Sequence, residues 1–180
     1  MNEIDDAARV RDCLQGDPQA FVALVERYEK PVYNVALRML RNREDARDVA
    51  QTTFLKAYQS LSSYDSQFRF YSWIYRIAIN ESLNALRSRR REAGPVDEWH
   101  ASSDPGPDEV LEAEREWREL LDAVESLKPD YRAVVVLKYF AGQSYQDMAV
   151  TLEIDEKTVK SRLFTARQLL KDRLVGPGEA

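Results

Sequence analysis

Apolar residues along this chain recur at the spacing of helices rather than strands. Between residues 44 and 61, for example, the apolar positions are Ala46, Val49, Ala50, Phe54 and Tyr58, most of them three or four residues apart. No segment alternates polar and apolar residues over the length of a strand. The pattern predicts an all-α protein with helices over 3–14, 18–40, 44–61 and 70–90, and then over 109–126, 129–140, 144–151 and 155–174.

Side chains that can cap helices mark several of these boundaries. Asp17 precedes Pro18, the order expected of an N-cap acid followed by proline at the first helical position. Ser144 and Asp147 have the spacing of a capping box. Pro31 lies inside the second predicted helix and is expected to kink or break it, because proline lacks a backbone N–H and its ring clashes with the preceding turn.

A segment rich in proline, glycine and acidic residues divides the chain at 92–108. This composition is typical of a flexible linker. We therefore expect two small helical domains, one over 1–91 and one over 109–180, joined by a flexible acidic linker. In the second domain, a short helix, a tight turn and a longer helix between 142 and 174 predict a helix-turn-helix.

Charge is distributed unevenly over these segments, although the whole chain has a net charge of −5. Residues 69–91 carry a net charge of +5 and residues 156–173 carry +4, whereas residues 92–119 carry −8. Either basic segment alone could be a solvated helix face. Two basic segments on predicted helices favour contact with a polyanion such as nucleic acid.

The last predicted helix has an apolar face and a basic one. Val159, Leu163, Ala166 and Leu170 recur at helical spacing and are expected to be buried. Basic side chains on the remaining surface can neutralise phosphates, and short polar or aromatic side chains there can meet base edges. The alternative is that the lysines are only solvated and that Phe164 packs within its own domain. The residues expected outside the apolar stripe are Lys157, Lys160, Ser161, Arg162, Phe164, Thr165, Arg167, Gln168 and Lys171.

Two segments of the N-terminal domain have features that a simple DNA-binding domain does not need. Asp45, Asp48 and Gln51 are three residues apart and form a polar row on one helical face. Two acids in a first helical turn also favour the helix dipole, which is the alternative explanation. Residues 68–80 combine many aromatic side chains with arginines, a mixture that suits stacking against unpaired bases.

Composition argues against several other classes of protein. Cys13 and His100 are the only cysteine and histidine, so the chain alone can form neither an internal disulfide nor a Cys/His zinc site. Cys13 could be a redox switch, although a lone helical cysteine more often packs as a small core residue. The sequence has no glycine-rich phosphate loop, metal-ligand cluster or histidine-based triad, so we expect no enzyme, no catalytic residue and no cofactor. The polar N-terminus and the lack of a long apolar run predict a cytoplasmic protein without membrane insertion.

The order of four segments resembles the bacterial sigma factors of the extracytoplasmic-function group, over nearly the whole chain. The segments are AFVALVERYEKPVYNVALRML, DARDVAQTTFLKAY, WIYRIAINESLNALRSRRR, and LKPDYRAVVVLKYFAGQSYQDMA followed by DEKTVKSRLFTARQLL. The resemblance implies a subunit that binds core RNA polymerase, directs initiation at promoters with −35 and −10 elements, and helps to open the DNA. The implied partners are the β′ clamp helices and the β flap of the polymerase, promoter DNA and an anti-sigma factor.

The resemblance also implies roles for residues that match the family's motifs, and it makes the loop 63–72 the cup for a base flipped out of the DNA. The residues implied in polymerase binding are Asp45, Asp48, Gln51 and Thr52. The residues implied in recognition and melting of the −10 element are Tyr64, Gln67, Phe68, Tyr71, Arg76, Asn80, Asn84, Arg87, Arg89 and Arg90. The residues implied in −35 recognition are Lys157, Thr158, Lys160, Ser161, Arg162, Phe164, Thr165 and Arg167.

A conventional dimeric helix-turn-helix regulator is the alternative that the residues themselves leave open. Such a protein would need a dimerisation surface and a symmetric operator. It would give no role to the polar row at Asp45, Asp48 and Gln51. Binding to core RNA polymerase distinguishes the two hypotheses.

Overall fold

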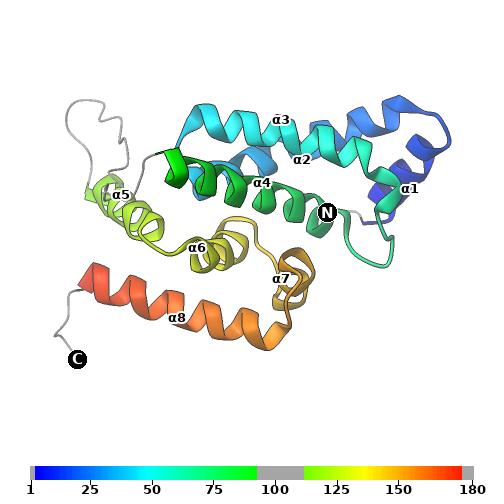
Figure 1. The fold of residues 1–180 in the computed structure, drawn as a ribbon. Helices are drawn as coiled ribbons and strands as arrows, with labels where there is room; N and C mark the ends of the chain where they lie inside the picture. The colour runs from blue at the N-terminus through cyan, green and yellow to red at the C-terminus, as the bar shows by residue number, and fades with distance from the viewer. Residues whose placement is uncertain (1–2, 93–111, 176–180) are drawn as a thin grey trace.

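The computed structural model describes residues 3–92 and 112–175, and these form two layers of helices without a strand in either range (Figure 1). The first layer consists of α1 (Glu3–Leu14), α2 (Pro18–Leu40), α3 (Arg43–Gln59), the 3₁₀ turn η1 (Leu61–Ser63) and α4 (Phe70–Glu92). The second layer consists of α5 (Glu112–Glu125), α6 (Pro129–Val135), the π-helical turn η2 (Val136–Phe140), α7 (Tyr145–Leu152) and α8 (Glu156–Val175). The all-α prediction is confirmed for these ranges. Apart from Glu92, the predicted linker lies outside the described residues.

The predicted caps form as expected. The carboxylate of Asp17 accepts a hydrogen bond from the backbone N–H of Gln19 at 2.9 Å, with Pro18 in the first turn of α2. At α7, the hydroxyl of Ser144 accepts from the N–H of Asp147 at 3.1 Å, and the carboxylate of Asp147 accepts from the N–H of Ser144 at 3.3 Å. These bonds satisfy backbone donors that a helix leaves unpaired at its start.

The expected break at Pro31 does not occur, because α2 runs from Pro18 to Leu40 as one helix. Proline inside a helix costs about 3 kcal/mol. Tyr28, Val32 and Val35, on both sides of the proline, are buried in the core. Each fully buried apolar side chain contributes about 1.5–3 kcal/mol. The packing of one continuous apolar face therefore outweighs the local cost of the proline.

The buried face of α3 differs from the apolar pattern read along its sequence. Tyr58 is 52% exposed and contacts Phe21 edge to face at its rim, so its assignment to the apolar face is wrong. Thr53 and Ala57 are buried instead. Thr53 can be buried because its hydroxyl donates to the backbone carbonyl of Val49 at 2.7 Å, so the buried hydroxyl has a hydrogen-bond partner.

The two layers share one core, because the buried side chains of both form a continuous cluster. Arg132 of α6 is the polar link inside it. Its guanidinium is buried and donates to the carbonyl of Met39 in the last turn of α2, and to the carbonyls of Glu125 and Leu127 around the end of α5. Carbonyls at a helix C-terminus lack helical partners and carry the negative end of the helix dipole, so a cation suits this position. Burial lowers the pKa of Arg132.

Ion pairs across the interface join arginines of the first layer to carboxylates of the second. Arg41, which ends α2 in a left-handed conformation (φ 51°), pairs with Asp122 and lies 3.4 Å from Glu125. Arg76 of α4 lies 3.0 Å from Glu153 at the end of α7. A third arginine of the first layer, Arg38, contacts aromatic rings of the second. Its guanidinium carbon lies 5.1 Å from the ring centroid of Phe140 and 5.7 Å from that of Trp117.

Replacing Arg132 tests whether this polar link stabilises the fold. Arg132→Met keeps much of the side-chain volume but leaves three buried carbonyls without their donor, and an unpaired buried polar group costs about 1–3 kcal/mol. We expect the free energy of unfolding, measured by urea denaturation, to fall by about 3 kcal/mol. The control is Arg43→Met at an exposed position of α3. Equal stability of the two variants would show that the link contributes nothing.

Candidate nucleic-acid interface

The polar row of α3 is partly open to solvent and partly engaged with α4. Asp48 and Gln51 are exposed on the outer side of α3, and Thr52 is half-buried beside them. Asp45 forms an ion pair with Arg89 of α4. The structure thus joins a residue predicted to bind polymerase to one predicted to bind the −10 element.

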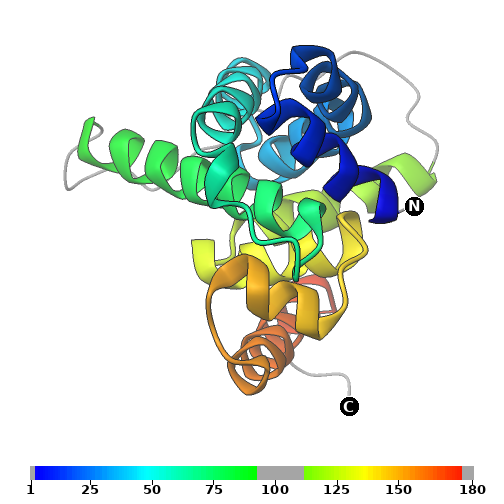
Figure 2. The ribbon, with the colours of Figure 1, turned by 90° about the vertical axis from the view of Figure 1, so that its right-hand side faces the viewer.

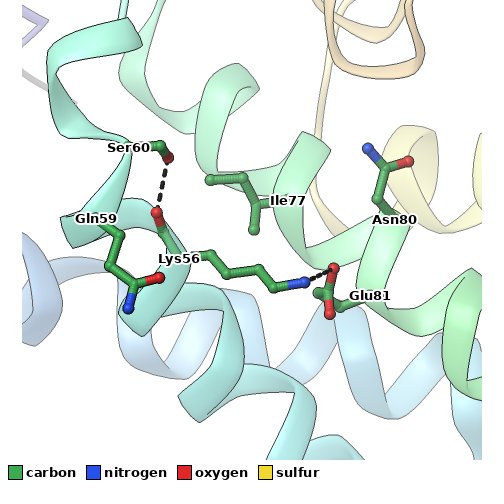
Figure 3. Close-up of a pocket in the computed structure, with 6 residues that line it drawn as sticks. All are labelled: Lys56, Gln59, Ser60, Ile77, Asn80 and Glu81. Atoms are coloured by element: carbon green, nitrogen blue, oxygen red, sulfur yellow. Dashed lines mark hydrogen bonds and ion pairs between the residues drawn. The ribbon is translucent and has the colours of Figure 1, made fainter.

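A shallow pocket lies between the C-terminal part of α3 and the middle of α4 (Figure 3). Its volume is about 360 Å³, and it is lined by Lys56, Gln59, Ser60, Ile77, Asn80 and Glu81. The ammonium of Lys56 lies 2.7 Å from a carboxylate oxygen of Glu81. The exposed Asn80 provides an amide with both donor and acceptor groups, and Ile77 adds an apolar surface. The pocket therefore combines an apolar surface with polar groups that can read the edge of a planar base.

Sequence reasoning found Asn80 but missed the other five lining residues. Gln59 and Ser60 lie three and four residues after Lys56 at the end of α3, and Asn80 and Glu81 lie three and four residues after Ile77 in α4. Three and four are the separations of neighbours on one helical face. That spacing shows which residues of one helix are neighbours. It does not show that these faces of α3 and α4 meet.

The predicted loop residues lie apart from this pocket. Tyr64 packs in an aromatic cluster, with its ring centroid 5.4 Å from that of Phe70 and 5.7 Å from that of Trp73. Its hydroxyl donates to the backbone carbonyl of Phe68 at 2.8 Å. Gln67 and Phe68 are exposed at the tip of the loop. None of these residues lines the pocket at Asn80.

The N-terminal half of α4 faces α7 instead of solvent. Arg76 donates to the backbone carbonyl of Val150 at 3.1 Å in addition to its ion pair with Glu153. Tyr71 is half-buried, and burial raises the pKa of its hydroxyl; burial likewise raises the pKa of Tyr75 to about 12. Arg76 and Tyr71, which both belong to the predicted −10 set, therefore lie at the interface between the layers.

The remaining residues of that set lie on the C-terminal half of α4. This part of the helix projects away from the rest of the molecule, which is clearest in Figure 2. Asn84, Arg87 and Arg90 are exposed there, and Arg87 donates to the amide oxygen of Asn84 at 3.0 Å. Together with Arg91, they present a basic surface with room for a polyanion.

The recognition helix of the helix-turn-helix is α8, at the outer edge of the second layer (Figure 1). Phe164 is 64% exposed, which excludes the alternative that it packs within its own domain in this structure. The apolar stripe is buried at Val159, Leu163 and Ala166, whereas Leu170 is only half-buried. The predicted residues that share the exposed surface are Lys157, Lys160, Ser161, Phe164 and Arg167.

Three further residues of the predicted −35 set lie on the flank or at the start of α8, and two of them have polar partners. Asp155 accepts hydrogen bonds from the hydroxyl and the N–H of Thr158, at 2.8 and 2.7 Å, and these bonds lower the pKa of Asp155. Arg162 lies 3.5 Å from Asp130 of α6. Thr165 lines a second cavity of about 630 Å³ between α8 and the segment joining α5 to α6. Within the described ranges, none of the helices combines the length and apolar character needed to cross a bilayer.

Both layers match protein families of the same kind. The family Sigma-70 region 2 matches residues 24–92, and the family Sigma-70, region 4 matches residues 117–170. The ECF RNA polymerase sigma-E factor of Haemophilus influenzae is 32% identical, covering 96% of each chain. The RNA polymerase sigma-H factor of Pseudomonas aeruginosa is 31% identical, covering 97% of this chain and 96% of that protein.

Solved structures resemble the fold as a whole. The structure of CnrH in complex with the cytosolic domain of CnrY has a TM-score of 0.74 and 25% identity, covering 97% of this chain and 99% of that one. The Bartonella quintana sigma factor RpoE, in complex with the anti-sigma factor NepR, has a TM-score of 0.70 and 24% identity, covering 88% and 98%. At 24% identity, the similarity to RpoE shows a shared fold and nothing more.

Proposed function

The chain belongs to the extracytoplasmic-function group of the sigma-70 family, and from that premise we propose which of its surfaces bind polymerase and which bind promoter DNA. It is an RNA polymerase sigma factor that acts in promoter-directed transcription. The observation that carries this function is that both sigma regions match, in order, on the two helical units. The dimeric regulator, the alternative left open by the residues, would use only the second unit.

The polar row of α3 is the proposed contact with the β′ clamp helices of core polymerase. Asp48 and Gln51 support this role because both are exposed on one outer face, with Thr52 beside them. Exposed polar groups suit a subunit that must dissociate, since such groups are stable in water before binding. Asp45 is proposed to contribute at the edge of this face while its ion pair with Arg89 links α3 to α4. The second unit is proposed to contact the β flap.

The pocket at Asn80 is the proposed receptor for a base of the −10 element flipped out of the duplex. Flipping costs a few kcal/mol of stacking and pairing, which a shaped pocket with hydrogen-bonding groups can offset. Asn80 supplies donor and acceptor, and the Lys56–Glu81 pair bounds the pocket on one side. Tyr64, Gln67, Phe68 and Tyr71 are proposed to contact neighbouring bases from the loop. Asn84, Arg87, Arg89 and Arg90 are proposed to hold the backbone of the opened strand.

The exposed surface of α8 is the proposed reader of the −35 element in the major groove. Ser161 and Phe164 can meet base edges and a thymine methyl group, and Lys157, Lys160 and Arg167 can neutralise phosphates. Thr158, Arg162 and Thr165 are proposed to act from the start and flank of the helix. The opposite face of α8 is buried in the core at Val159 and Leu163, which fixes the helix that is proposed to read the bases.

Binding of the −10 element by α4 is proposed to require separation of the two layers. Arg76 cannot hold DNA while its guanidinium binds Val150 and Glu153, and Tyr71 is half-buried at the same interface. In addition, Thr151 is buried and its hydroxyl lies 3.3 Å from the carbonyl of Ser72 in α4. Binding to polymerase is the proposed source of the free energy that replaces these contacts.

We also propose that the chain acts in the cytoplasm, where core polymerase is found, and that it contributes binding rather than catalysis. A regulator of the anti-sigma class is proposed from the family to which the chain belongs, and the similar CnrH structure likewise contains a partner, the cytosolic domain of CnrY. Such a regulator should lower the amount of chain bound to core polymerase in a competition experiment. Unchanged binding at saturating regulator would contradict its assignment.

Asp48→Arg tests the polymerase contact. Reversal of charge on the exposed row should reduce the affinity for core polymerase by about tenfold or more, because close like charges at an interface cost several kcal/mol. The measurement is fluorescence anisotropy of the labelled chain titrated with core polymerase. Glu26→Arg, the same change at an exposed position of α2, is the control and should bind normally. Normal binding by Asp48→Arg would place the contact elsewhere.

Asn80→Ala tests the proposed base pocket. Loss of the amide should leave affinity for core polymerase unchanged and slow promoter opening by about tenfold, the effect of losing about 1.4 kcal/mol of base contact. Opening is followed by permanganate reactivity of unpaired thymines on a promoter that the native holoenzyme selects from a library. Asn34→Ala on the exposed side of α2 is the control. Equal opening rates for both variants would remove Asn80 from the pocket's function.

The double substitution Thr151→Val and Glu153→Gln tests closure of the two layers. It removes the hydrogen bond to Ser72 and the charge that pairs with Arg76. We expect a larger radius of gyration for the free chain in small-angle X-ray scattering, while thermal unfolding of each unit persists. Gln146→Ala, exposed on α7, is the control. An unchanged radius would mean that these contacts do not hold the layers together.

A further inference from the structure

Three basic side chains gather around two tyrosines beside the recognition helix. The ammonium groups of Lys138 in η2 and Lys160 in α8 lie 4.8 and 5.6 Å from the ring centroid of Tyr145, the first residue of α7. Arg167 of α8 donates from Nε to the hydroxyl of Tyr139 at 2.8 Å, and its guanidinium carbon lies 5.8 Å from the centroid of that ring. The cluster is thus built from three elements.

Like charges repel, so their convergence needs a compensating interaction. The aromatic faces supply part of it, because a cation over a ring gains about 0.5–1 kcal/mol at an exposed site. One carboxylate contributes as well, since Glu156 lies 2.6 Å from Lys160. Lys138 also donates to the carbonyl of Gln143 at 3.3 Å. In a chain with a net charge of −5, this local excess of positive charge indicates an anionic ligand.

The position of the cluster indicates which anion it binds. Lys160 and Arg167 are two turns apart on α8, and the exposed Phe164 lies between them. They flank the surface that, under the proposed function, enters the major groove. The walls of that groove are the phosphate backbones, so cations at the flank of a recognition helix meet phosphates while the helix surface meets bases.

We propose that Lys138, Lys160 and Arg167 form a site for the phosphodiester oxygens of one DNA strand, and that Tyr139 is a positioning residue that orients Arg167. This inference rests on the proposed role of α8. Tyr139 is 55% exposed, so burial of its ring does not account for its place in η2. The hydroxyl of Tyr139 accepts from Nε, and Arg167 also interacts with Tyr145, so the two tyrosines hold the guanidinium beside the exposed surface of α8. A guanidinium held in this way can bind a phosphate in a bidentate manner.

The experiment measures binding of the full chain to a labelled random-sequence duplex of about 30 base pairs, by fluorescence anisotropy over a range of salt concentrations. Lys138→Ala should weaken binding about threefold to tenfold and reduce the slope of log affinity against log salt by about 0.9, because one phosphate contact is lost. Tyr139→Phe keeps the ring and every charge. It should weaken binding about threefold and leave the salt slope unchanged. Arg43→Ala, an exposed cation in α3, is the control.

A double-mutant cycle separates positioning from direct contact by the tyrosine. Arg167→Lys keeps the charge but loses Nε, so it should lower affinity without changing the salt slope. In that background Tyr139→Phe should have no further effect, since the two residues act through one hydrogen bond. Full additivity would overturn the positioning role of Tyr139.

Lys157→Ala, on the exposed surface of α8, distinguishes failure of this site from failure of the proposed function. If Lys157→Ala weakens binding while Lys138→Ala and Tyr139→Phe bind like the native chain, the phosphate site is wrong and the role of α8 stands. If all three variants bind like the native chain, or if the native chain does not bind the duplex, both assignments are wrong.

Discussion

The buried guanidinium of Arg132 is the constraint on which the arrangement of this molecule depends. It donates to carbonyls at the C-terminus of α2 and around the end of α5, so it connects the first layer to the second inside their shared core. A buried charge is tolerated only where hydrogen bonds replace its lost hydration. The two helix ends must therefore lie where the guanidinium can reach both, and this fixes how α2 meets the second layer.

That arrangement leaves some of the proposed binding surfaces exposed and covers others. The polar row of α3, the pocket at Asn80 and the outer face of α8 remain on the surface. The start of α4 does not, because α7 occupies Arg76. Arginines of one layer meet carboxylates of the other throughout this contact, and such pairs weaken as salt or a competing polyanion screens them. Under the proposed function, Arg76 thus holds the layers together in the free chain and later serves the promoter.

Local physical rules, applied to the sequence, predict several helix caps and buried positions of this structure. The caps at Asp17 and Ser144 form because a short polar side chain before a helix can accept a hydrogen bond from a backbone N–H group that the first turn leaves unpaired. Val159, Leu163 and Ala166 of α8 are buried as their spacing predicts, whereas Leu170 is only half-buried. Pro31 and Tyr58 show the limit of such rules. Burial of apolar side chains on both sides of Pro31 keeps α2 unbroken. Tyr58 lies at the edge of the contact between α3 and α2, and the position of that edge depends on how the two helices pack.

The sequence by itself determined the all-α class, most helix boundaries, the helix-turn-helix and the order of segments that identifies the family, because these depend on residues near one another in the chain. Only the tertiary structure decided that Asp45 pairs with Arg89, that five unforeseen residues surround Asn80, and that Tyr139 holds Arg167. Each of these joins residues from different helices. Helical periodicity states which face of a helix is buried, but it contains no information about which face of another helix packs against it.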